Sequence, residues 1–230
     1  MDEQFPVSSW MLQSFDKGRK MASIRLQAEG LEMRFGRRLL FRNLDIQASS
    51  GEFLAITGQN GSGKSTLVRI LAGILAPTAG TVQLLADGIE LTERPFFIGL
   101  VAPYLNLYEG FTLRENMRFV ARVRGLGTTT ATEEALIQKV QLQGRADELV
   151  GNYSSGMKQR ARFALALLTN PPVLMLDEPT ANLDDSGKAF VWNTVEEARA
   201  SGKLVLVATN EAEEAERAER QVKVERPNMR

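Results

Sequence analysis

One nine-residue stretch constrains this 230-residue chain more than any other feature. Gly58-Gln-Asn-Gly-Ser-Gly-Lys-Ser-Thr66 follows a short apolar segment, Glu52–Thr57, and leads into a helical pattern over Lys64–Ala72. Glycines at this spacing let the backbone curl so that successive amide groups point inward, and the following helix adds the positive end of its dipole. The stretch therefore predicts a phosphate-binding loop between a strand and a helix of an α/β fold.

Two side chains of this loop have distinct predicted roles. Lys64 is long enough to reach the β- and γ-phosphates of a nucleotide, and the Ser65 hydroxyl is a suitable ligand for Mg²⁺. A glycine-rich turn without function is the alternative, and the strand-then-helix setting argues against it. The residues predicted to contact nucleotide are Gly58, Asn60, Gly61, Ser62, Gly63, Lys64, Ser65 and Thr66.

Two adjacent carboxylates form a second element. Val173–Leu176 is an apolar run after two prolines, typical of a buried strand, and it ends in Asp177 and Glu178. A carboxylate at the tip of such a strand can hold Mg²⁺, directly or through water, and we assign that role to Asp177. Glu178 is placed to polarise an attacking water, so it is the predicted catalytic carboxylate.

The segment Tyr153-Ser-Ser-Gly-Met157 begins a further predicted helix, Ser155–Leu168. Small residues at a helix start supply a hydroxyl and free amide groups, which favour anion binding. One nucleotide cannot easily be held by two such sites on one small chain. We therefore expect this helix to bind the γ-phosphate held by a second copy.

Two absences exclude whole classes of chemistry. The chain contains no cysteine and no histidine, which removes disulfides, thiol nucleophiles, Ser–His–Asp triads and imidazole zinc sites.

The 28 basic and 28 acidic residues of the chain balance, which argues against a dedicated nucleic-acid binder. No apolar run approaches the roughly 18 residues that span a bilayer, and the N-terminus lacks the apolar core of a signal peptide. A cytoplasmic location is therefore expected.

The remaining pattern alternates strands and helices. Short antiparallel strands, punctuated by Gly30 and Gly36, are expected over Ile24–Gln47. Thr112-Leu-Arg-Glu115 has the capping-box pattern and predicts a helix that ends near Gly125. Further strands are predicted at Thr81–Leu85, Phe96–Ala102 and Lys203–Ala208, and further helices at Thr132–Leu142, Asp184–Ala200 and Ala212–Arg220. This order predicts a mostly parallel sheet covered by helices on both faces.

Over roughly Ser23 to Val224, these motifs resemble the ATP-binding cassette subunit of an ABC transporter. The resemblance implies a P-loop NTPase fold, in which a RecA-like parallel sheet carries an antiparallel β subdomain and a helical signature subdomain at about residues 104–165. It implies an ATP-binding domain over residues 21–230. Residues 1–20 are expected to be a poorly ordered extension, with a docking segment as the alternative.

The same resemblance assigns roles to individual residues. Gly58–Ser65 is the Walker A motif and Val173–Asp177 the Walker B strand. Phe35 matches the aromatic residue that stacks on adenine, with a plain core phenylalanine as the alternative. The signature that binds ATP across a dimer comprises Tyr153, Ser154, Ser155, Gly156 and Met157, and the D-loop contains Asn182, Leu183 and Asp184.

Two positions depart from the family pattern. The family usually has a glutamine where this chain has Pro103, which can neither ligate Mg²⁺ nor donate a hydrogen bond. The switch histidine is replaced by Asn210, whose amide can still donate to a γ-phosphate oxygen but carries no positive charge. We therefore expect intact ATP binding and slowed turnover, with Lys64, Glu178 and Asn210 as the catalytic set.

The resemblance implies a dimer that hydrolyses Mg-ATP to drive transport through an integral-membrane partner at the cytoplasmic face of the membrane. The aromatic stretch Tyr104, Leu105, Leu107, Tyr108 and Phe111 could receive that partner or simply pack the helical region. The signature resembles those of export systems, so export is favoured over import. A regulatory cassette with slow turnover is the main alternative, and a soluble relative acting on ribosomes or DNA is disfavoured.

Overall fold

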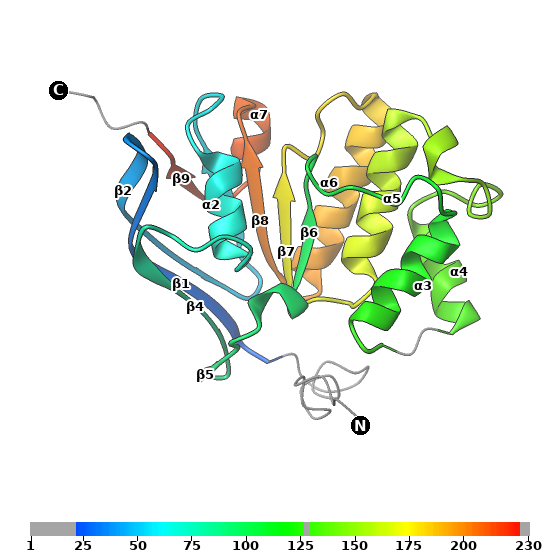
Figure 1. Ribbon diagram of the computed structural model, residues 1–230, viewed down its shortest axis with the longest axis horizontal. Helices are drawn as coiled ribbons and strands as arrows, with labels where there is room; N and C mark the ends of the chain where they lie inside the picture. The colour runs from blue at the N-terminus through cyan, green and yellow to red at the C-terminus, as the bar shows by residue number, and fades with distance from the viewer. Residues whose placement is uncertain (1–21, 127–128, 226–230) are drawn as a thin grey trace.

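The computed structural model describes residues 22–126 and 129–225, so the predicted extension over residues 1–20 lies outside it. Five parallel strands form the central sheet in the order β6-β7-β8-β3-β9. They are β3 (Phe53–Thr57), β6 (Ile98–Val101), β7 (Val173–Asp177), β8 (Leu204–Thr209) and β9 (Arg220–Lys223). Every residue of β7 and β8 is buried, because helices cover both faces of the sheet (Figure 1). The predicted parallel sheet is confirmed.

A second, antiparallel sheet stands beside the first. It consists of β1 (Ile24–Phe35), β2 (Arg38–Ser49), β4 (Ala79–Ala86) and β5 (Ile89–Glu90), in the order β2-β1-β4-β5. The strands are longer than the short runs predicted. Gly36 makes the expected turn, but Gly30 lies inside β1 at a shift of register, where a bulge bends the strand without ending it.

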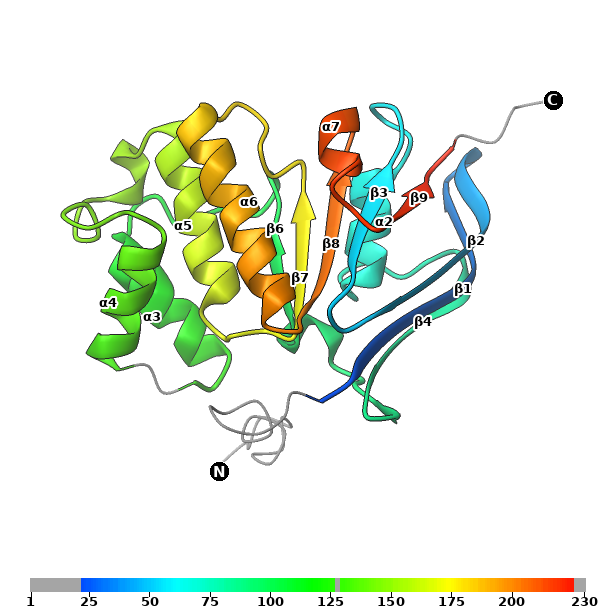
Figure 2. The same ribbon diagram turned by 180° about the vertical axis from the view of Figure 1, so that it is seen from behind.

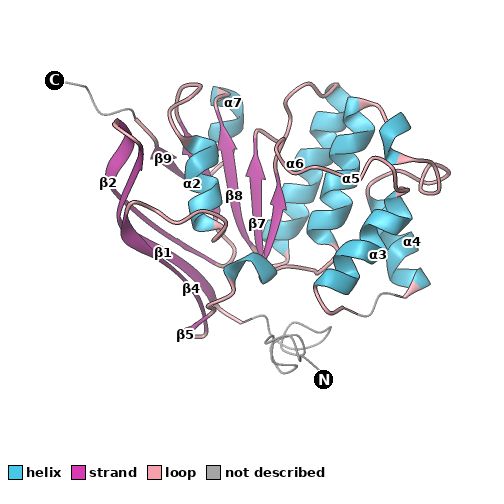
Figure 3. Cartoon of the chain, viewed as in Figure 1, coloured by secondary structure: helices cyan, strands magenta, loops and turns pink. Residues whose placement is uncertain are grey.

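The helices lie in separate layers. Helix α2 (Lys64–Leu71) lies between the two sheets, and α5 (Ser155–Leu167) and α6 (Asp185–Ala200) cover the opposite face of the central sheet (Figures 1 and 2). Beyond them lie α3 (Leu113–Val123) and α4 (Thr130–Lys139) (Figure 3). No helix in the described ranges is long and apolar enough to cross a membrane.

The capping box predicted for α3 is present. The Thr112 hydroxyl accepts a hydrogen bond from the Glu115 amide at 3.1 Å, and the Glu115 carboxylate accepts one from the Thr112 amide at 2.8 Å. Each side chain thereby satisfies a backbone donor that the helix start leaves unpaired. Two 3-10 turns are also present, at Arg94–Phe96 and Val150–Asn152.

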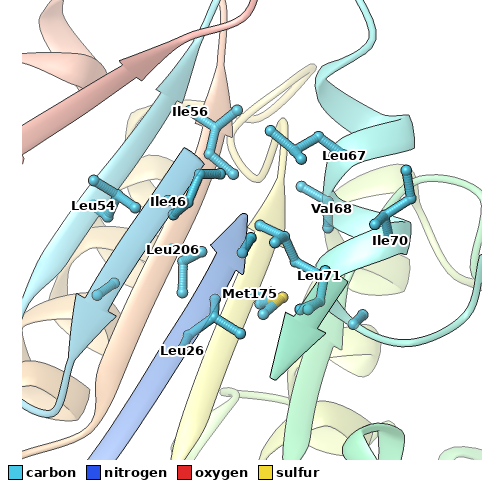
Figure 4. Close-up of a cluster of buried hydrophobic side chains, with 14 of the residues drawn as sticks. Leu26, Ile46, Leu54, Ile56, Leu67, Val68, Ile70, Leu71, Met175 and Leu206 are labelled. Carbon is cyan, nitrogen blue, oxygen red and sulfur yellow. The ribbon is translucent and has the colours of Figure 1, made fainter. Parts of the chain in front are cut away.

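Two hydrophobic cores lie on opposite faces of the central sheet. On β3, Leu54 and Ile56 belong to the core around α2, whereas Phe53 belongs to the core under the helices. This alternation follows from the two-residue period of a strand. Figure 4 shows the first core, in which Leu67 and Leu71 of α2 lie close to side chains of both sheets.

The C-terminal part differs from its prediction. A helix was expected over Ala212–Arg220, but α7 spans only Ala212–Ala215 and the chain then forms β9. The apolar side chains of Val222 and Val224 pack against the core around α2, and β9 pairs with β3. Strand pairing and burial of these valines therefore override the helical propensity of the glutamate-rich segment.

Candidate functional site

A cleft of about 1310 Å³ opens at the carboxyl ends of the parallel strands, which point to the top of Figure 1. It brings together segments that are far apart in the sequence: the loop before α2 and the loops after β6, β7 and β8. The predicted site residues that line it are Phe35, Asn60, Gly61, Gly63, Lys64, Ser65, Thr66, Glu178, Asn182, Leu183 and Asn210. Open α/β sheets bind ligands at this edge.

The backbone of the phosphate loop depends on its glycines. Gly58, Gly61 and Gly63 have φ of 149°, 72° and 113°, all in the region that favours glycine. A Cβ at Gly58 would stand 2.5 Å from the Val224 carbonyl oxygen and 2.7 Å from Ser62 Oγ. The turn after β9 therefore packs directly under the loop, and no larger residue fits at this position.

The ammonium of Lys64 has two partners. Its Nζ donates to the Gly58 carbonyl at 2.9 Å and lies 3.2 Å from Glu178 Oε1. Lys64 is only 5% exposed, so this charge is held at a fixed place inside the loop. The contact with Glu178 could not be predicted from sequence, because the two residues meet only when β3 and β7 lie in one sheet.

Asp177 lies at the end of β7 and does not line the cleft surface. Its side chain is almost fully buried, and neither carboxylate oxygen has a hydrogen bond among the described residues. Burial raises the pKa of this carboxyl, and the Ser65 hydroxyl and the Lys64 ammonium beside it lower that pKa in part.

Two orphaned oxygens beside a serine hydroxyl fit a hard divalent cation. The described residues contain no group of three or more acidic side chains able to hold a metal alone. Such a site suits an ion that also takes oxygen ligands from a bound phosphate. Proteins commonly bind Mg²⁺ in this way, through one or two carboxylates and phosphate oxygens.

Glu178 has an unusual backbone. Its φ is 47°, which a residue with a side chain adopts at a cost. The Glu178 amide donates to the Ala208 carbonyl at 2.8 Å, which joins the ends of β7 and β8. Burial raises the pKa of the Glu178 carboxyl, and the Lys64 ammonium opposes this shift. The side chain stays 25% exposed to the cleft, where a water could reach it.

Phe35 ends β1 and is 53% exposed at the cleft edge. The alternative of a core phenylalanine is therefore wrong. An exposed ring on the cleft wall is available for stacking on a flat ligand. Pro103 and Asn210, the two residues that depart from the family pattern, both line the same cleft.

The signature residues lie elsewhere. Ser154, Ser155 and Gly156 do not line the cleft of their own chain, and the two serines are exposed. The Ser154 hydroxyl caps α5 by accepting from the Met157 amide at 3.2 Å. Tyr153 is buried and donates to the Arg145 carbonyl at 2.7 Å.

The D-loop runs from the cleft to α6. Asn182 and Leu183 line the cleft, and Asn182 has a left-handed backbone with φ of 60°. Asp184 caps α6, because its Oδ1 accepts from the Gly187 amide at 2.8 Å. This bond, with one from the Ser186 hydroxyl, lowers the pKa of Asp184.

Two functional candidates were missed by sequence reasoning. Thr180 and Glu214 line the cleft, and both are buried. Thr180 follows the Asp177-Glu178 pair closely in the chain, and this proximity was the only sequence indication that Thr180 has a functional role. Glu214 is one of several glutamates in an acidic stretch, and nothing in that stretch distinguishes it.

Comparison with known proteins identifies a family and relatives that this chain resembles. A sequence profile of the ABC transporter family matches residues 41–181. Nod factor export ATP-binding protein I from Rhizobium sp. (strain N33) is 35% identical over 201 residues, covering 86% of this chain and 66% of that protein. This chain therefore spans slightly less than two thirds of the relative.

Two solved structures share the architecture. The ATP-binding subunit of an ABC transporter is 26% identical with a TM-score of 0.76, covering 87% of this chain and 86% of that one. A dimeric ATP-binding cassette in a post-hydrolysis state with ADP and Pi is 25% identical with a TM-score of 0.77, covering 87% and 94%.

Proposed function

This chain belongs to the ABC transporter family, and we propose that it binds Mg-ATP and hydrolyses it as a dimer to drive export through a membrane partner. The observation that carries the proposal is the pairing of Lys64 and Glu178 in the cleft, with the carboxylate of Asp177 buried beside them. The export direction is supported by the relative named for Nod factor export.

The chemistry follows from the positions of these side chains. When the γ-phosphate enters the loop, it replaces Glu178 as the main partner of the Lys64 ammonium. The freed carboxylate then orients a water and accepts its proton as the water oxygen attacks the γ-phosphorus. The bond to the β-phosphate oxygen breaks, giving ADP and inorganic phosphate.

Asp177 and Ser65 would hold Mg²⁺, which neutralises charge on the phosphate oxygens. The amide of Asn210, which also lines the cleft, would donate to a γ-phosphate oxygen. Because Asn210 adds no positive charge, transition-state stabilisation at this point is weaker than a cation would supply.

A second copy would complete the site. The exposed Ser154 and Ser155 at the start of α5 do not line the cleft of their own chain. Such a helix start attracts anions, so it suits the γ-phosphate in the cleft of a partner. Dimerisation is supported by the dimeric cassette with the same fold.

The membrane partner would dock on an aromatic patch formed by Tyr108, Phe111 and Phe119. These rings are 40–51% exposed and contact one another with centroids 4.9–6.5 Å apart. The buried Asn116 side chain binds both the amide and the carbonyl of Tyr108 at 3.0 Å, which holds the patch in place. A preformed apolar surface of this kind suits a hydrophobic helix from another protein.

Steady-state Mg-ATP hydrolysis by the purified chain tests the proposal, with Glu178→Gln as the control. We expect slow turnover that disappears in the variant while ATP binding remains. Equal phosphate release by both proteins would contradict it.

A second candidate is a regulatory cassette that binds ATP and pairs with a more active subunit. Pro103 and Asn210 at the cleft wall favour it. ATP binding without turnover, both alone and with membrane subunits, would select this candidate.

A further inference from the structure

Glu214 is a buried carboxylate that joins two loops of the cleft. It lies on α7 and is 8% exposed. One of its oxygens accepts a hydrogen bond from the Thr180 hydroxyl, and the other accepts one from the Thr209 hydroxyl at 2.6 Å. Both threonines are buried as well, so water competes little for these bonds.

The two threonines come from the segments that carry the predicted catalytic groups. Thr180 stands two residues after Glu178, and Thr209 stands one residue before Asn210. The Thr209 oxygen also accepts from the Glu211 amide at 3.0 Å, so α7 is tied to the same point. Through Glu214, the loops after β7 and β8 therefore have a fixed separation.

The hydrogen bonds of Glu214 help to hold the strained backbone of Glu178. A residue with φ of 47° keeps that conformation only where its surroundings impose it. The Glu178 amide is held by Ala208 on one side, and Thr180 is held by Glu214 on the other. Without the second bond, the segment after Glu178 can relax and move the carboxylate.

Stability alone gives little reason for a carboxylate at this place. Glu214 has no ion-pair partner in the ranges the structure describes, and a buried charge costs free energy that hydroxyl donors offset only in part. An apolar side chain would fill the site without that cost. What the two carboxylate oxygens supply is a bridge in which both hydroxyls donate.

We propose that Glu214 is a positioning residue for hydrolysis, holding Glu178 and Asn210 at the separation that the reaction requires. This rests on the ATP hydrolysis proposed above. Glu214 acts through Thr180 and Thr209, and its charge also contributes to the raised pKa of the Glu178 carboxyl. It makes no hydrogen bond to the described residues of the phosphate loop, so we expect it to set kcat and to leave ATP binding unchanged.

The test compares Glu214→Gln with the parent chain and with Glu216→Gln, an exposed neighbour on the same segment. Glutamine keeps the shape but has only one oxygen to accept a bond. Displacement of a reacting group by about 1 Å can cost up to about a hundredfold in rate, so we expect kcat to fall about tenfold or more. The ATP dissociation constant should stay within about twofold, and Glu216→Gln should match the parent.

Thr209→Val provides a second, independent variant, because valine has the shape of threonine without the hydroxyl. It should lower kcat in the same direction, and adding it to Glu214→Gln should cost less than the product of the two single effects. Thermal unfolding of each variant identifies any loss of folded protein.

The outcomes separate this inference from the proposed function. If the parent hydrolyses ATP and folded Glu214→Gln does so at the parental kcat, the positioning role is wrong while the proposed function stands. Equal losses in kcat and ATP affinity also overturn it, because they indicate general damage to the cleft. A parent chain that never turns over ATP, alone or with its membrane subunits, overturns both.

Discussion

Lys64 and Glu178 form an ion pair across the cleft, with Nζ 3.2 Å from Oε1. The phosphate loop and the proposed catalytic carboxylate are thus in direct contact. Binding of ATP must break this pair, and the γ-phosphate must tolerate the nearby negative charge of Glu178. The first prediction follows from this competition.

Glu178→Gln should bind ATP more tightly than the parent while losing turnover. The neutral amide neither competes strongly for Lys64 nor repels the γ-phosphate. We expect a dissociation constant about three- to tenfold lower, measured by equilibrium binding of a non-hydrolysable ATP analogue. Unchanged or weaker affinity would show that the ion pair does not oppose binding. Glu213→Gln, an exposed carboxylate on the same cleft wall, controls for the general loss of negative charge.

Asn210→His should raise kcat. An imidazolium at this wall would add a positive charge where negative charge develops on the γ-phosphate, and one such contact is worth about tenfold or more. Asn210→Gln, which lengthens the amide without adding charge, is the matched control. If Asn210→Gln raised kcat as much as Asn210→His, the effect would come from the longer side chain and not from its charge. The measurement is initial phosphate release at saturating Mg-ATP.

Phe35→Ala should weaken ATP binding by about tenfold, because a base stacked on an aromatic ring gains roughly 1–3 kcal/mol. Phe35→Trp should preserve affinity, since stacking needs only a flat ring. The exposed ring contributes little to the core, so thermal unfolding of both variants should match the parent. Equal ATP affinity in Phe35→Ala would remove Phe35 from the nucleotide site.

Tyr108→Glu should leave basal ATP hydrolysis unchanged and abolish its stimulation by the membrane subunits in proteoliposomes. The patch lies outside the cleft, and a charge among three contacting rings disfavours an apolar partner. Tyr108→Phe keeps the ring and should retain stimulation. Normal stimulation of Tyr108→Glu would place the partner on another surface.

Lys203 should make stability depend on alkaline pH. Lys203 is buried just before β8, and its ammonium donates to Asn170 Oδ1 at 2.6 Å. Burial lowers the pKa of this ammonium to about 8. Between pH 8 and 10.5 the unfolded chain therefore binds more protons than the folded one, so the contribution of Lys203 to the free energy of unfolding rises with pH.

Lys203→Met removes this dependence. The stability of the variant relative to the parent should fall as pH rises across that range, by on the order of 2 kcal/mol. Urea unfolding at several pH values measures the difference, and subtraction of the two curves cancels groups common to both proteins. A constant difference would mean that Lys203 keeps an ordinary pKa.

The sequence motifs were predictable because each is defined by residues that are close together in the chain. The Gly58–Thr66 loop, the strand ending in Asp177 and the Thr112 capping box each depend on a few consecutive residues. The contacts that complete the site were not predictable in this way. Lys64 meets Glu178, and Glu214 meets Thr180, only through the order of strands in the sheet.

The C-terminal error has a similar cause. The segment from Ala212 to Arg220 is rich in alanine and glutamate, which favour a helix. The open edge of β3 and the space for Val222 and Val224 lie outside any local window. The exposure of Phe35 is also tertiary, since a phenylalanine ending a strand can point to a core or to a cleft.

The two cores on opposite faces of the central sheet have a consequence for how such a chain can change over generations. Residues such as Leu54 and Phe53 alternate between the faces, so a substitution under the helices is felt first by α5 and α6. It reaches the cleft through the strands and through Trp192, which belongs to that core and lines the cleft. If the aromatic patch meets a transport partner as proposed, selection can alter it while the nucleotide chemistry stays constant, because Tyr108, Phe111 and Phe119 are exposed and do not line the cleft. The same energy-converting unit can in this way be inherited by machines that carry unrelated cargo.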